Sequence, residues 1–372
     1  MYFQVQKARS FVLTLIVKIK FYLLSFFIVG SGAQAQSLKV GVVGLTHDHA
    51  HGLMNQYKKG EVNIVGIVEA DTQLIDRYKK RYQLTESLFY KSMAEMLSKA
   101  KPDAVLAYNA ISDHLSVVEA CAPKGISVMV EKPLATTVKD AERMGTLARQ
   151  YNIQVLTNYE TTWYPSNQQV QVMVNEQNAI GNIRKMVVHD GHQGPKEIGC
   201  SAEFLSWLTD PIKNGGGALT DFGCYGANLM TWLMKGEAPV AVTAVTRQIK
   251  PDIYPKVDDD ATILLEYADA TGIVEASWNW PFGIKDLEVF GTTGYLHAEN
   301  ANTIRERKKD IYEVVPMKQP VYTSNLVYLA DVLNKKITPG NDLSSYSNNL
   351  IVVKILEAAR QSAKEGRRVL VK

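Results

Sequence analysis

The stretch Val128-Met129-Val130-Glu131-Lys132-Pro133 predicts a short apolar β-strand that ends at a Lys-Pro step. Pro133 has no N–H for a sheet ladder, and it excludes helical dihedral angles at Lys132. A long cationic side chain therefore lies at the carboxyl end of this strand. In a doubly wound parallel sheet, ligands bind along that edge. Lys132 is accordingly either a solvated strand end or a reactive group that faces a bound cofactor.

The sequence on both sides of this strand alternates between strand and helix patterns. Between the apolar runs, hydrophobic residues recur with the 3.6-residue period of amphipathic helices, as at Ala50, Leu53, Met54 and Tyr57. Strands are predicted at 38–43, 63–68, 104–107, 128–130 and 154–157. This alternation is typical of a parallel sheet with helices on both faces. We therefore expect a doubly wound α/β domain over 36–157.

The first strand–helix turn, 41–49, has the spacing of a dinucleotide-binding fingerprint but only part of its residues. Gly44 matches the first glycine of G-x-G-x-x-G, whereas Thr46 and His49 occupy the other two positions. The turn still presents backbone N–H groups at a helix start, which suits a phosphate. Gly44, Thr46, His47 and His49 are therefore candidate cofactor contacts.

Glu69 follows the second predicted strand, where dinucleotide-binding domains carry an acidic residue. A carboxylate at this position accepts hydrogen bonds from ribose hydroxyls and repels a 2′-phosphate. We therefore expect NAD as the cofactor rather than NADP. Asp71 is an alternative for this role, and an ordinary acidic turn residue is the competing interpretation.

His47, Asp48, His49 and His51 raise the question of a metal site. His47 and His51 lie four residues apart, which is a ligand spacing on a helix. Against a metal, the cluster lies where phosphates are expected, and no cysteine or acidic partner is near in sequence. We expect no metal, and we interpret these side chains as phosphate or nicotinamide contacts or as solvated groups.

The first 35 residues differ from the rest of the chain. An uncharged apolar run at 21–29 follows several basic residues, and Ala33-Gln34-Ala35 offers small residues for cleavage. This pattern predicts a secretory signal peptide, and the run is too short to cross a bilayer. We expect a periplasmic or secreted mature chain that begins near Gln36 and has no membrane association after cleavage.

The excess positive charge of the chain belongs to this segment. The 372 residues contain 41 Lys+Arg and 38 Asp+Glu, a formal charge of +3. Four basic residues and no acidic ones lie in the first 35, so the remaining chain has 37 against 38 and a charge of −1. The charge balance therefore does not indicate a nucleic-acid partner.

Three cysteines, Cys121, Cys200 and Cys224, are too few for a disulfide framework. Cys121 falls on a predicted helix, where a buried thiol is expected. A bridge between Cys200 and Cys224 is an open alternative in an oxidising compartment.

A second distinctive stretch is Gly215-Gly216-Gly217-Ala218-Leu219-Thr220-Asp221-Phe222-Gly223-Cys224-Tyr225. Its three glycines allow the backbone to pass close to a ligand or to another strand. Asp221 and Tyr225 lie four residues apart, so we expect both on one side of one helix. A carboxylate and a phenol that face a cleft containing Lys132 can bind a diol and move its proton. The competing interpretation is a helix-capping Asp and a packed Tyr.

With these motifs in place, the chain resembles the glucose–fructose oxidoreductase / inositol dehydrogenase / MocA family. The resemblance covers about 38–294. It rests on the degenerate fingerprint, on the glycine-rich stretch that ends at Tyr225, and on the following residues: Glu69, Asn109, His114 and Glu131-Lys132-Pro133-Leu134-Ala135. The order and separation of the two motifs make the match specific.

The resemblance implies a fold and an assembly. The fold would be a Rossmann NAD(P)-binding domain at 36–157 and an α+β domain with a large, mostly antiparallel open sheet at 158–340. A C-terminal helix at 341–372 would pack back on the core. In the family, the open sheet often packs against a second subunit, so a homo-oligomer, dimer or tetramer, is expected.

The resemblance also implies roles for the central residues. Lys132 matches the family's catalytic-site lysine, and Asp221 matches the carboxylate that positions substrate. Tyr225 stands where most members have a catalytic histidine. A phenol needs a nearby cation such as Lys132 to lower its pKa before it can act as a base at neutral pH.

Further contacts are expected around these three residues. Asn109, His114, Glu131 and Lys132 join the candidate cofactor contacts through the family resemblance. The candidate substrate contacts are Lys132, Asp221 and Tyr225, together with Trp163, whose ring can stack on a sugar, and His192, which lies in a polar loop.

The leading expectation is an exported NAD(P)-dependent oxidoreductase that acts on a sugar or sugar derivative by hydride transfer. Free NAD is scarce outside the cytoplasm, so the cofactor should be tightly bound and recycled in place. Two alternatives stay open. One is an NAD-dependent glycosidase with a transient oxidation–elimination cycle, and the other is a non-catalytic sugar-binding protein.

Overall fold

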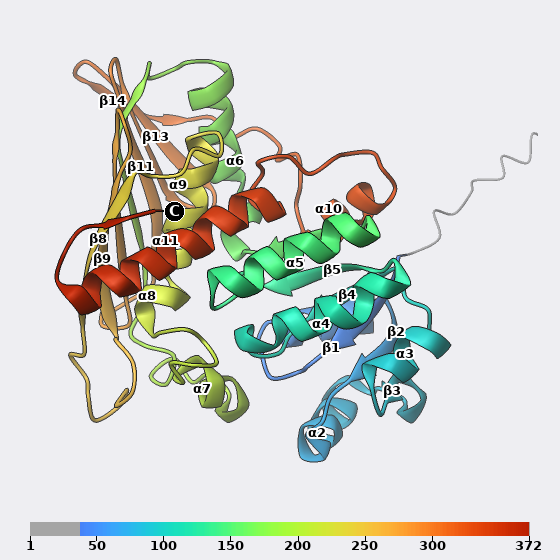
Figure 1. The fold of residues 1–372 in the computed structure, drawn as a ribbon. Helices are drawn as coiled ribbons and strands as arrows, with labels where there is room; N and C mark the ends of the chain where they lie inside the picture. The colour runs from blue at the N-terminus through green and yellow to red at the C-terminus, as the bar shows by residue number, and fades with distance from the viewer. Residues whose placement is uncertain (1–37, 372) are drawn as a thin grey trace, which may run out of the picture. The chain divides into compact units, whose positions relative to one another are not determined.

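The computed structural model describes residues 38–371 and contains two β-sheets (Figure 1). The signal peptide predicted at 1–35 lies outside the described residues. Over 38–371, no helix combines the length and apolar character needed to cross a bilayer.

The first sheet is wholly parallel, with the strand order β3-β2-β1-β4-β5-β6. This is the order of a doubly wound dinucleotide-binding sheet, and it confirms the predicted α/β fold class. Its strands are β1 (Lys39–Val43), β2 (Asn63–Val68), β3 (Phe89–Tyr90), β4 (Ala104–Ala107), β5 (Ser127–Glu131) and β6 (Val155–Asn158).

Helices cover both faces of this sheet because its strands are apolar on both faces. Leu106 and Met129 point into one core cluster, and their neighbours Val105 and Val128 point into another. The first cluster is completed by α1 (Ala50–Lys58), α2 (Thr72–Tyr82) and α10 (Asn325–Leu333). The second is completed by α3 (Met93–Lys99), α4 (His114–Cys121) and α5 (Val138–Tyr151).

The second sheet has nine strands in the order β14-β13-β12-β11-β7-β10-β9-β8-β15. Only the β7–β10 pair is parallel among these, which confirms the predicted mostly antiparallel open sheet. The strands are β7 (Ile183–Gly191), β8 (Ala241–Arg247), β9 (Asp260–Glu266), β10 (Thr271–Ser277), β11 (Ile284–Gly291), β12 (Tyr295–Asn300), β13 (Thr303–Lys308), β14 (Ile311–Val315) and β15 (Val369–Leu370).

One helix connects the cores of the two sheets. In Figure 1, α11 (Tyr346–Glu365) runs from the second sheet to α5. Val352 and Ile355 of α11 are buried with the second sheet, whereas Val353 is buried with the first. The other helices of this half are α6 (Pro165–Gln171), α7 (Ala202–Leu208), α8 (Ala218–Asp221) and α9 (Gly223–Leu233).

The close contact between α5 and α11 depends on Gly145. A Cβ atom at Gly145 would lie 2.1 Å from Oη of Tyr346, which donates a hydrogen bond to the carbonyl of Ala141 (3.1 Å). We expect Gly145→Ala to lower the free energy of unfolding by about 1–3 kcal/mol, because the new methyl group displaces Tyr346 from a packed interface. Urea unfolding followed by circular dichroism measures the change.

Gly52→Ala in α1 is the matched control. A Cβ atom at Gly52 meets nothing within 4 Å, so this variant should gain up to about 1 kcal/mol of stability from helix propensity. Equal unfolding midpoints for the two variants would contradict the packing of α11 against α5.

Candidate active site

A buried ion pair joins the end of β5 to the end of α8. Nζ of Lys132 lies 2.5 Å from Oδ1 of Asp221 and 2.9 Å from its carbonyl oxygen, and each side chain is 7% exposed. Burial disfavours both charges. Their mutual attraction outweighs it, so the pKa of Lys132 is raised and the pKa of Asp221 is lowered. The structure thus brings together two predicted site residues that lie 89 positions apart.

Hydrogen bonds hold the two loops that carry this pair. After the cis Lys132–Pro133 peptide, the carbonyl of Thr136 accepts a hydrogen bond from Nη2 of Arg360 in α11 (2.7 Å). Ahead of Asp221, the carboxylate of Asp258 accepts hydrogen bonds from the backbone N–H groups of Gly217 (2.9 Å) and Leu219 (2.7 Å). A Cβ atom at Gly217 would lie 1.7 Å from the carbonyl oxygen of Asp258. The glycine-rich stretch therefore permits close approach to another backbone segment.

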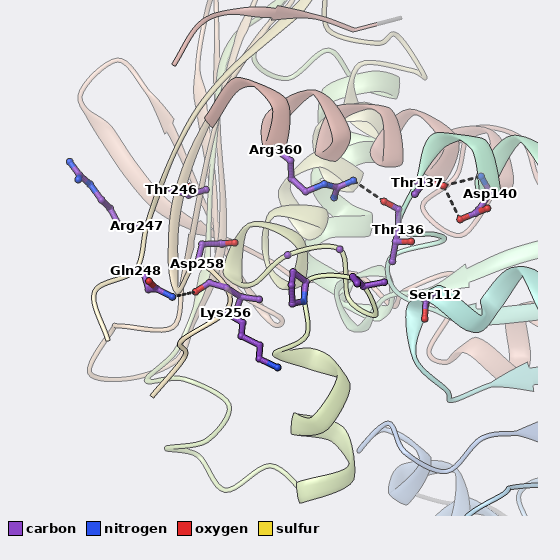
Figure 2. Close-up of a pocket in the computed structure, with 15 residues that line it drawn as sticks. Ser112, Thr136, Thr137, Asp140, Thr246, Arg247, Gln248, Lys256, Asp258 and Arg360 are labelled. Carbon is purple, nitrogen blue, oxygen red and sulfur yellow. Dashed lines mark hydrogen bonds between the residues drawn. The ribbon is translucent and has the colours of Figure 1, made fainter. Parts of the chain in front are cut away.

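These loop-holding groups line a cavity of about 890 Å³. Figure 2 shows its lining side chains, with Arg360 directed at Thr136. Its lining includes Gly215, Gly216 and Asp258, but not Lys132. We place the candidate active site at the Lys132–Asp221 ion pair and not in this cavity. Several titratable groups are buried together around the ion pair, which is typical of functional sites.

Asp221 has a further partner that the sequence analysis missed. Nε1 of Trp278, a fully buried side chain, donates a hydrogen bond to Oδ2 of Asp221 (2.9 Å). A tryptophan next to a strand is compatible with stacking on a sugar or with packing in the sheet. Trp278 instead fixes the orientation of the Asp221 carboxylate, and the pattern of the strand does not reveal such a contact.

Tyr225 lies beside the ion pair but not on the same helix as Asp221. The prediction of one continuous helix was wrong. The carbonyl of Phe222 accepts a hydrogen bond from the N–H of Tyr225, three residues later, and this tight turn separates α8 from α9. Nζ of Lys132 lies 4.9 Å from the centre of the Tyr225 ring, and Nζ of Lys285 lies 4.6 Å from it. Two ammonium groups thus contact one phenol ring.

The expectation that Lys132 lowers the pKa of Tyr225 was also wrong. Burial raises the pKa of this phenol well above its usual value, and the carboxylates of Asp190 and Glu160 raise it further. Lys132 is hydrogen-bonded to Asp221, and its charge does not offset the effect of burial on the pKa of Tyr225. Tyr225 is therefore a neutral hydroxyl at physiological pH.

Asp190, Lys285 and Glu160 form a second polar group that sequence reasoning missed. Asp190 of β7 and Lys285 of β11 are directly opposite each other in the antiparallel pair. Nζ of Lys285 lies 2.6 Å from Oε2 of Glu160 and 4.0 Å from Oδ1 of Asp190. Asp190 is 1% exposed, and burial raises its pKa to about 8. Only the register of the two strands reveals this pair.

The turn after β1 is tied to the end of β4. The backbone N–H of His47 and the hydroxyl of Thr46 both donate to the carbonyl of Tyr108. Gly44 has φ +80°, and a Cβ atom there would lie 2.7–2.8 Å from atoms of Asn109. Oδ1 of Asn109 is buried and has no hydrogen-bond partner among the described residues. These predicted cofactor contacts therefore lie together at the crevice between adjacent strands of the sheet.

Glu69 lies directly after β2, the strand next to β1. Its carboxylate accepts hydrogen bonds from the backbone N–H groups of Leu45 (2.7 Å), Ala70 (2.7 Å) and Asp71 (2.9 Å). The side chain of Asp71 instead caps α2, where it accepts hydrogen bonds from the N–H groups of Gln73 and Leu74. Glu69 is therefore the carboxylate that extends into the β1 turn.

Two histidines of this turn reach Glu131 at the end of β5. Nδ1 of His49 lies 3.0 Å from Oε2 of Glu131, and Nε2 of His47 lies 3.9 Å from the same oxygen. Nδ2 of Asn158 donates to the other oxygen (2.8 Å). Burial alone would raise the pKa of Glu131, but these partners outweigh it and the pKa is about 2. His51 lies apart, stacked on Tyr78.

The cluster of His47, His49 and Glu131 has ligand atoms within 4.8 Å of one another. The acidic member of this cluster, Glu131, comes from β5, which is distant from the two histidines in sequence. However, Nδ1 of His47 accepts the backbone N–H of His49 (3.1 Å). The ring proton then lies on Nε2, the nitrogen that faces Glu131, and a protonated nitrogen cannot bind a metal. We interpret the cluster as a hydrogen-bonded group.

The remaining predicted contacts, His192, His114 and Trp163, lie at different distances from the ion pair. His192 lies near the ion pair: its ring meets the Phe222 ring edge-on (4.8 Å), and Asp221 acts on its pKa. His114 is fully buried, and its Nδ1 donates to the carbonyl of Leu134, so it supports the loop after Pro133. Trp163 lines another cavity, of about 300 Å³. The structure therefore brings only His192 of these three to the site.

Cys200 and Cys224 do not form the bridge that the sequence left open. Both are free thiols, and Cys224 is fully buried beside the carbonyl of Asp221. Burial raises the pKa of each to about 12.

Two family profiles match most of the described chain. Residues 38–159 match the NAD-binding Rossmann fold of the oxidoreductase family, and residues 168–297 match the GFO/IDH/MocA C-terminal domain. The chain belongs to the GFO/IDH/MocA oxidoreductase family. Its N-terminal domain is therefore an NAD-binding domain. Glu69 at the β2 edge and the unpaired oxygen of Asn109 fit a dinucleotide with free hydroxyl groups.

Similar proteins agree with this assignment. Trans-1,2-dihydrobenzene-1,2-diol dehydrogenase of Xenopus tropicalis is 22% identical over 80% of this chain and 89% of its own length. The aldose–aldose oxidoreductase of Caulobacter crescentus, complexed with glycerol, has a TM-score of 0.76 at 22% identity and covers 90% of this chain and 100% of its own. An inositol dehydrogenase homologue from Azotobacter vinelandii, complexed with NAD⁺, has a TM-score of 0.75 at 18% identity, over 90% and 98% of the two chains.

The buried ion pair generates a stability prediction. We expect Lys132→Met to lower the free energy of unfolding by about 3–5 kcal/mol, because it leaves the carboxylate of Asp221 buried without its cation. Lys132→Met combined with Asp221→Leu should regain most of this loss. Urea unfolding at neutral pH gives the coupling between the two sites, and additive losses would show that the two side chains do not interact.

Proposed function

We propose that this protein is an NAD-dependent oxidoreductase that acts on a CH–OH group of a sugar or sugar-like polyol. The observation that carries the proposal is the buried Lys132–Asp221 pair, with Tyr225 beside it, at the carboxyl end of β5. This is the sheet edge where a dinucleotide-binding domain holds its cofactor. The similar proteins named above support the substrate class, since their names refer to a diol, an aldose and an inositol.

The residues around the pair have complementary tasks. Lys132 donates a hydrogen bond to the reacting oxygen and stabilises negative charge that develops there. Asp221, held by Lys132 and Trp278, accepts a hydrogen bond from a neighbouring hydroxyl. His192 accepts the N–H of Gly194 at Nδ1, so its proton lies on Nε2 and can be donated to substrate. NAD, when bound, supplies the hydride acceptor.

The direct test is oxidation of polyols by the purified chain. Mass spectrometry of the denatured protein shows whether NAD copurifies, and NADH fluorescence reports oxidation of myo-inositol, glucose and xylose. We expect NADH with at least one polyol, and no NADH with Lys132→Met. Cleavage of chromogenic glycosides without net NADH would identify the NAD-dependent glycosidase instead. Absence of NAD and NADP uptake in calorimetry would identify a non-catalytic sugar-binding protein.

Cofactor choice gives a further prediction. Glu69→Gln keeps a hydrogen-bond acceptor for Leu45 but removes the negative charge that repels a 2′-phosphate. We expect the preference for NAD over NADP, measured as the ratio of dissociation constants, to fall by about tenfold. Asp76→Asn, an equal charge change at an exposed position of α2, is the matched control. An unchanged ratio in Glu69→Gln would exclude Glu69 from the ribose site.

We also propose export, on the strength of the signal-like sequence at 1–35. Expression of the full chain in a Gram-negative host, followed by mass measurement of the periplasmic product, tests this. The expected mature chain begins near Gln36. An uncleaved chain confined to the cytoplasmic fraction would contradict export.

A homo-oligomer is proposed through the outer face of the second sheet. Apolar side chains are exposed there, including Val245 (55%) and Phe290 (37%) on strands whose inward neighbours are buried. Light scattering coupled to size exclusion should give a dimer or tetramer at micromolar concentration. A monomer would contradict the proposed assembly.

A further inference from the structure

The backbone of Trp278 is held by groups outside the sheet ladder. Trp278 directly follows Ser277, the last paired residue of β10. Its N–H donates a hydrogen bond to the carbonyl of Asp259 (2.8 Å), and its carbonyl accepts one from Nζ of Lys250 (2.6 Å). These two bonds fix the residue whose indole N–H orients the carboxylate of Asp221.

The ammonium group of Lys250 has two further acceptors on a different loop. Nζ donates hydrogen bonds to the carbonyl of Gln193 (2.7 Å) and to the carboxylate of Glu197. An ammonium has three N–H donors, so each of the three acceptors takes one of them. Gln193 and Glu197 follow β7, whereas Trp278 follows β10, the parallel neighbour of β7. One side chain therefore ties together the two loops that leave this edge of the sheet.

Lys250 is itself anchored at both ends. The carboxylate of Asp259, which is fully buried, accepts a hydrogen bond from the backbone N–H of Lys250 (2.6 Å). At the other end, the hydroxyl of Tyr254 donates to Glu197, and the Tyr254 ring lies 4.8 Å from the ring of Trp278. The ammonium group of Lys250 is therefore a fixed point between the loops, unlike the mobile charge of most surface lysines.

The loop after β7 carries His192 next to the acceptor Gln193. The N–H of His192 donates to the carbonyl of Ser277 (3.0 Å), so His192 lies beside the end of β10. Its ring meets the Phe222 ring edge-on (4.8 Å), one residue after Asp221. In the proposed function, His192 donates a hydrogen bond to the substrate and Asp221 accepts one from it. The spacing of these two groups therefore decides whether both reach the same polyol.

We propose that Lys250 is a positioning residue for the substrate. Through the carbonyls of Trp278 and Gln193, its ammonium group fixes the spacing between the two side chains that hold the polyol. On one side it acts through Trp278 on the carboxylate of Asp221, and on the other side it acts through the loop that carries His192. Lys250 takes no part in hydride or proton transfer. The inference rests on the proposed oxidoreductase function.

Lys250→Met tests this role, because it keeps an unbranched side chain and removes all three N–H donors. We expect kcat/KM for the polyol to fall by about 10-fold to 100-fold, because a small displacement of groups that orient a substrate is costly. The dissociation constant of NAD, measured by calorimetry, should be unchanged, because Glu69 and Asn109 lie in the other domain. An equal loss of NAD binding would indicate general disruption and would overturn the positioning role.

Lys256→Met is the matched control. Lys256 lies in the same connection between β8 and β9 as Lys250, but it is exposed. The same chemical change there should leave kcat/KM at the wild-type value. Equal losses in the two variants would show an effect of net charge, and a wild-type kcat/KM in Lys250→Met would show no effect on the substrate. Either result would overturn the positioning role while the oxidoreductase function stands.

A second measurement does not depend on turnover. In ¹H–¹⁵N NMR spectra, the indole N–H resonance of Trp278, assigned with Trp278→Phe, reports its hydrogen bond to Asp221. We expect this resonance to shift in Lys250→Met, and its exchange with solvent to become at least about 10-fold faster. Lys256→Met should leave both unchanged.

The two measurements separate the inference from the function on which it rests. An unchanged indole resonance in Lys250→Met would overturn the positioning role even if polyols are oxidised. A shifted resonance in a protein that oxidises no polyol would instead reject the proposed function, and the positioning role with it. If Lys250→Met does not fold, Lys250→Gln takes its place with the same expected results.

Discussion

The ion pair between Lys132 and Asp221 is the constraint on which the site depends. It joins a loop of the parallel sheet to a helix that lies against the antiparallel sheet, and both charges are almost completely removed from water. Such a pair is weak evidence for stability, because desolvation offsets most of the attraction. It does fix geometry. Arg360 holds the loop after Lys132, and Asp258 holds the glycines before Asp221, so the two charges meet in one arrangement.

The carboxyl groups around this pair differ in pKa because their surroundings differ. Glu131, with two histidines and an amide as partners, has a pKa of about 2, whereas Asp190, nearly without partners, has a pKa of about 8. Environments that separate the pKa values of like groups are the physical basis for acid and base roles in one site. In the proposed function, the groups that stay charged bind and orient the substrate, whereas burial brings the pKa of Asp190 to about 8.

Local patterns in the sequence predicted five of the six strands of the first sheet but not the two-residue strand β3. Two motifs predicted that Lys132 and Asp221 belong to one site. Residues whose roles depend on pairing across strands escaped prediction. Asp190 and Lys285 lie 95 positions apart, and only the β7–β11 register places them together. Glu131 was a candidate cofactor contact, but its contacts with His47 and His49, which reach it across the end of β4, were not predicted. Trp163 was predicted as a substrate contact from its residue type, but Trp278 is the tryptophan that donates a hydrogen bond to Asp221.

A crystal structure of this protein with bound NAD tests the central claim most directly. The claim is that a lysine of one domain and a carboxylate and phenol of the other surround the reacting end of the cofactor. It predicts the nicotinamide ring beside Lys132 and Tyr225, with the adenosine ribose at Glu69. A dinucleotide whose nicotinamide lies away from the ion pair, for example in the cavity lined by Arg360 and Asp258, would contradict the account.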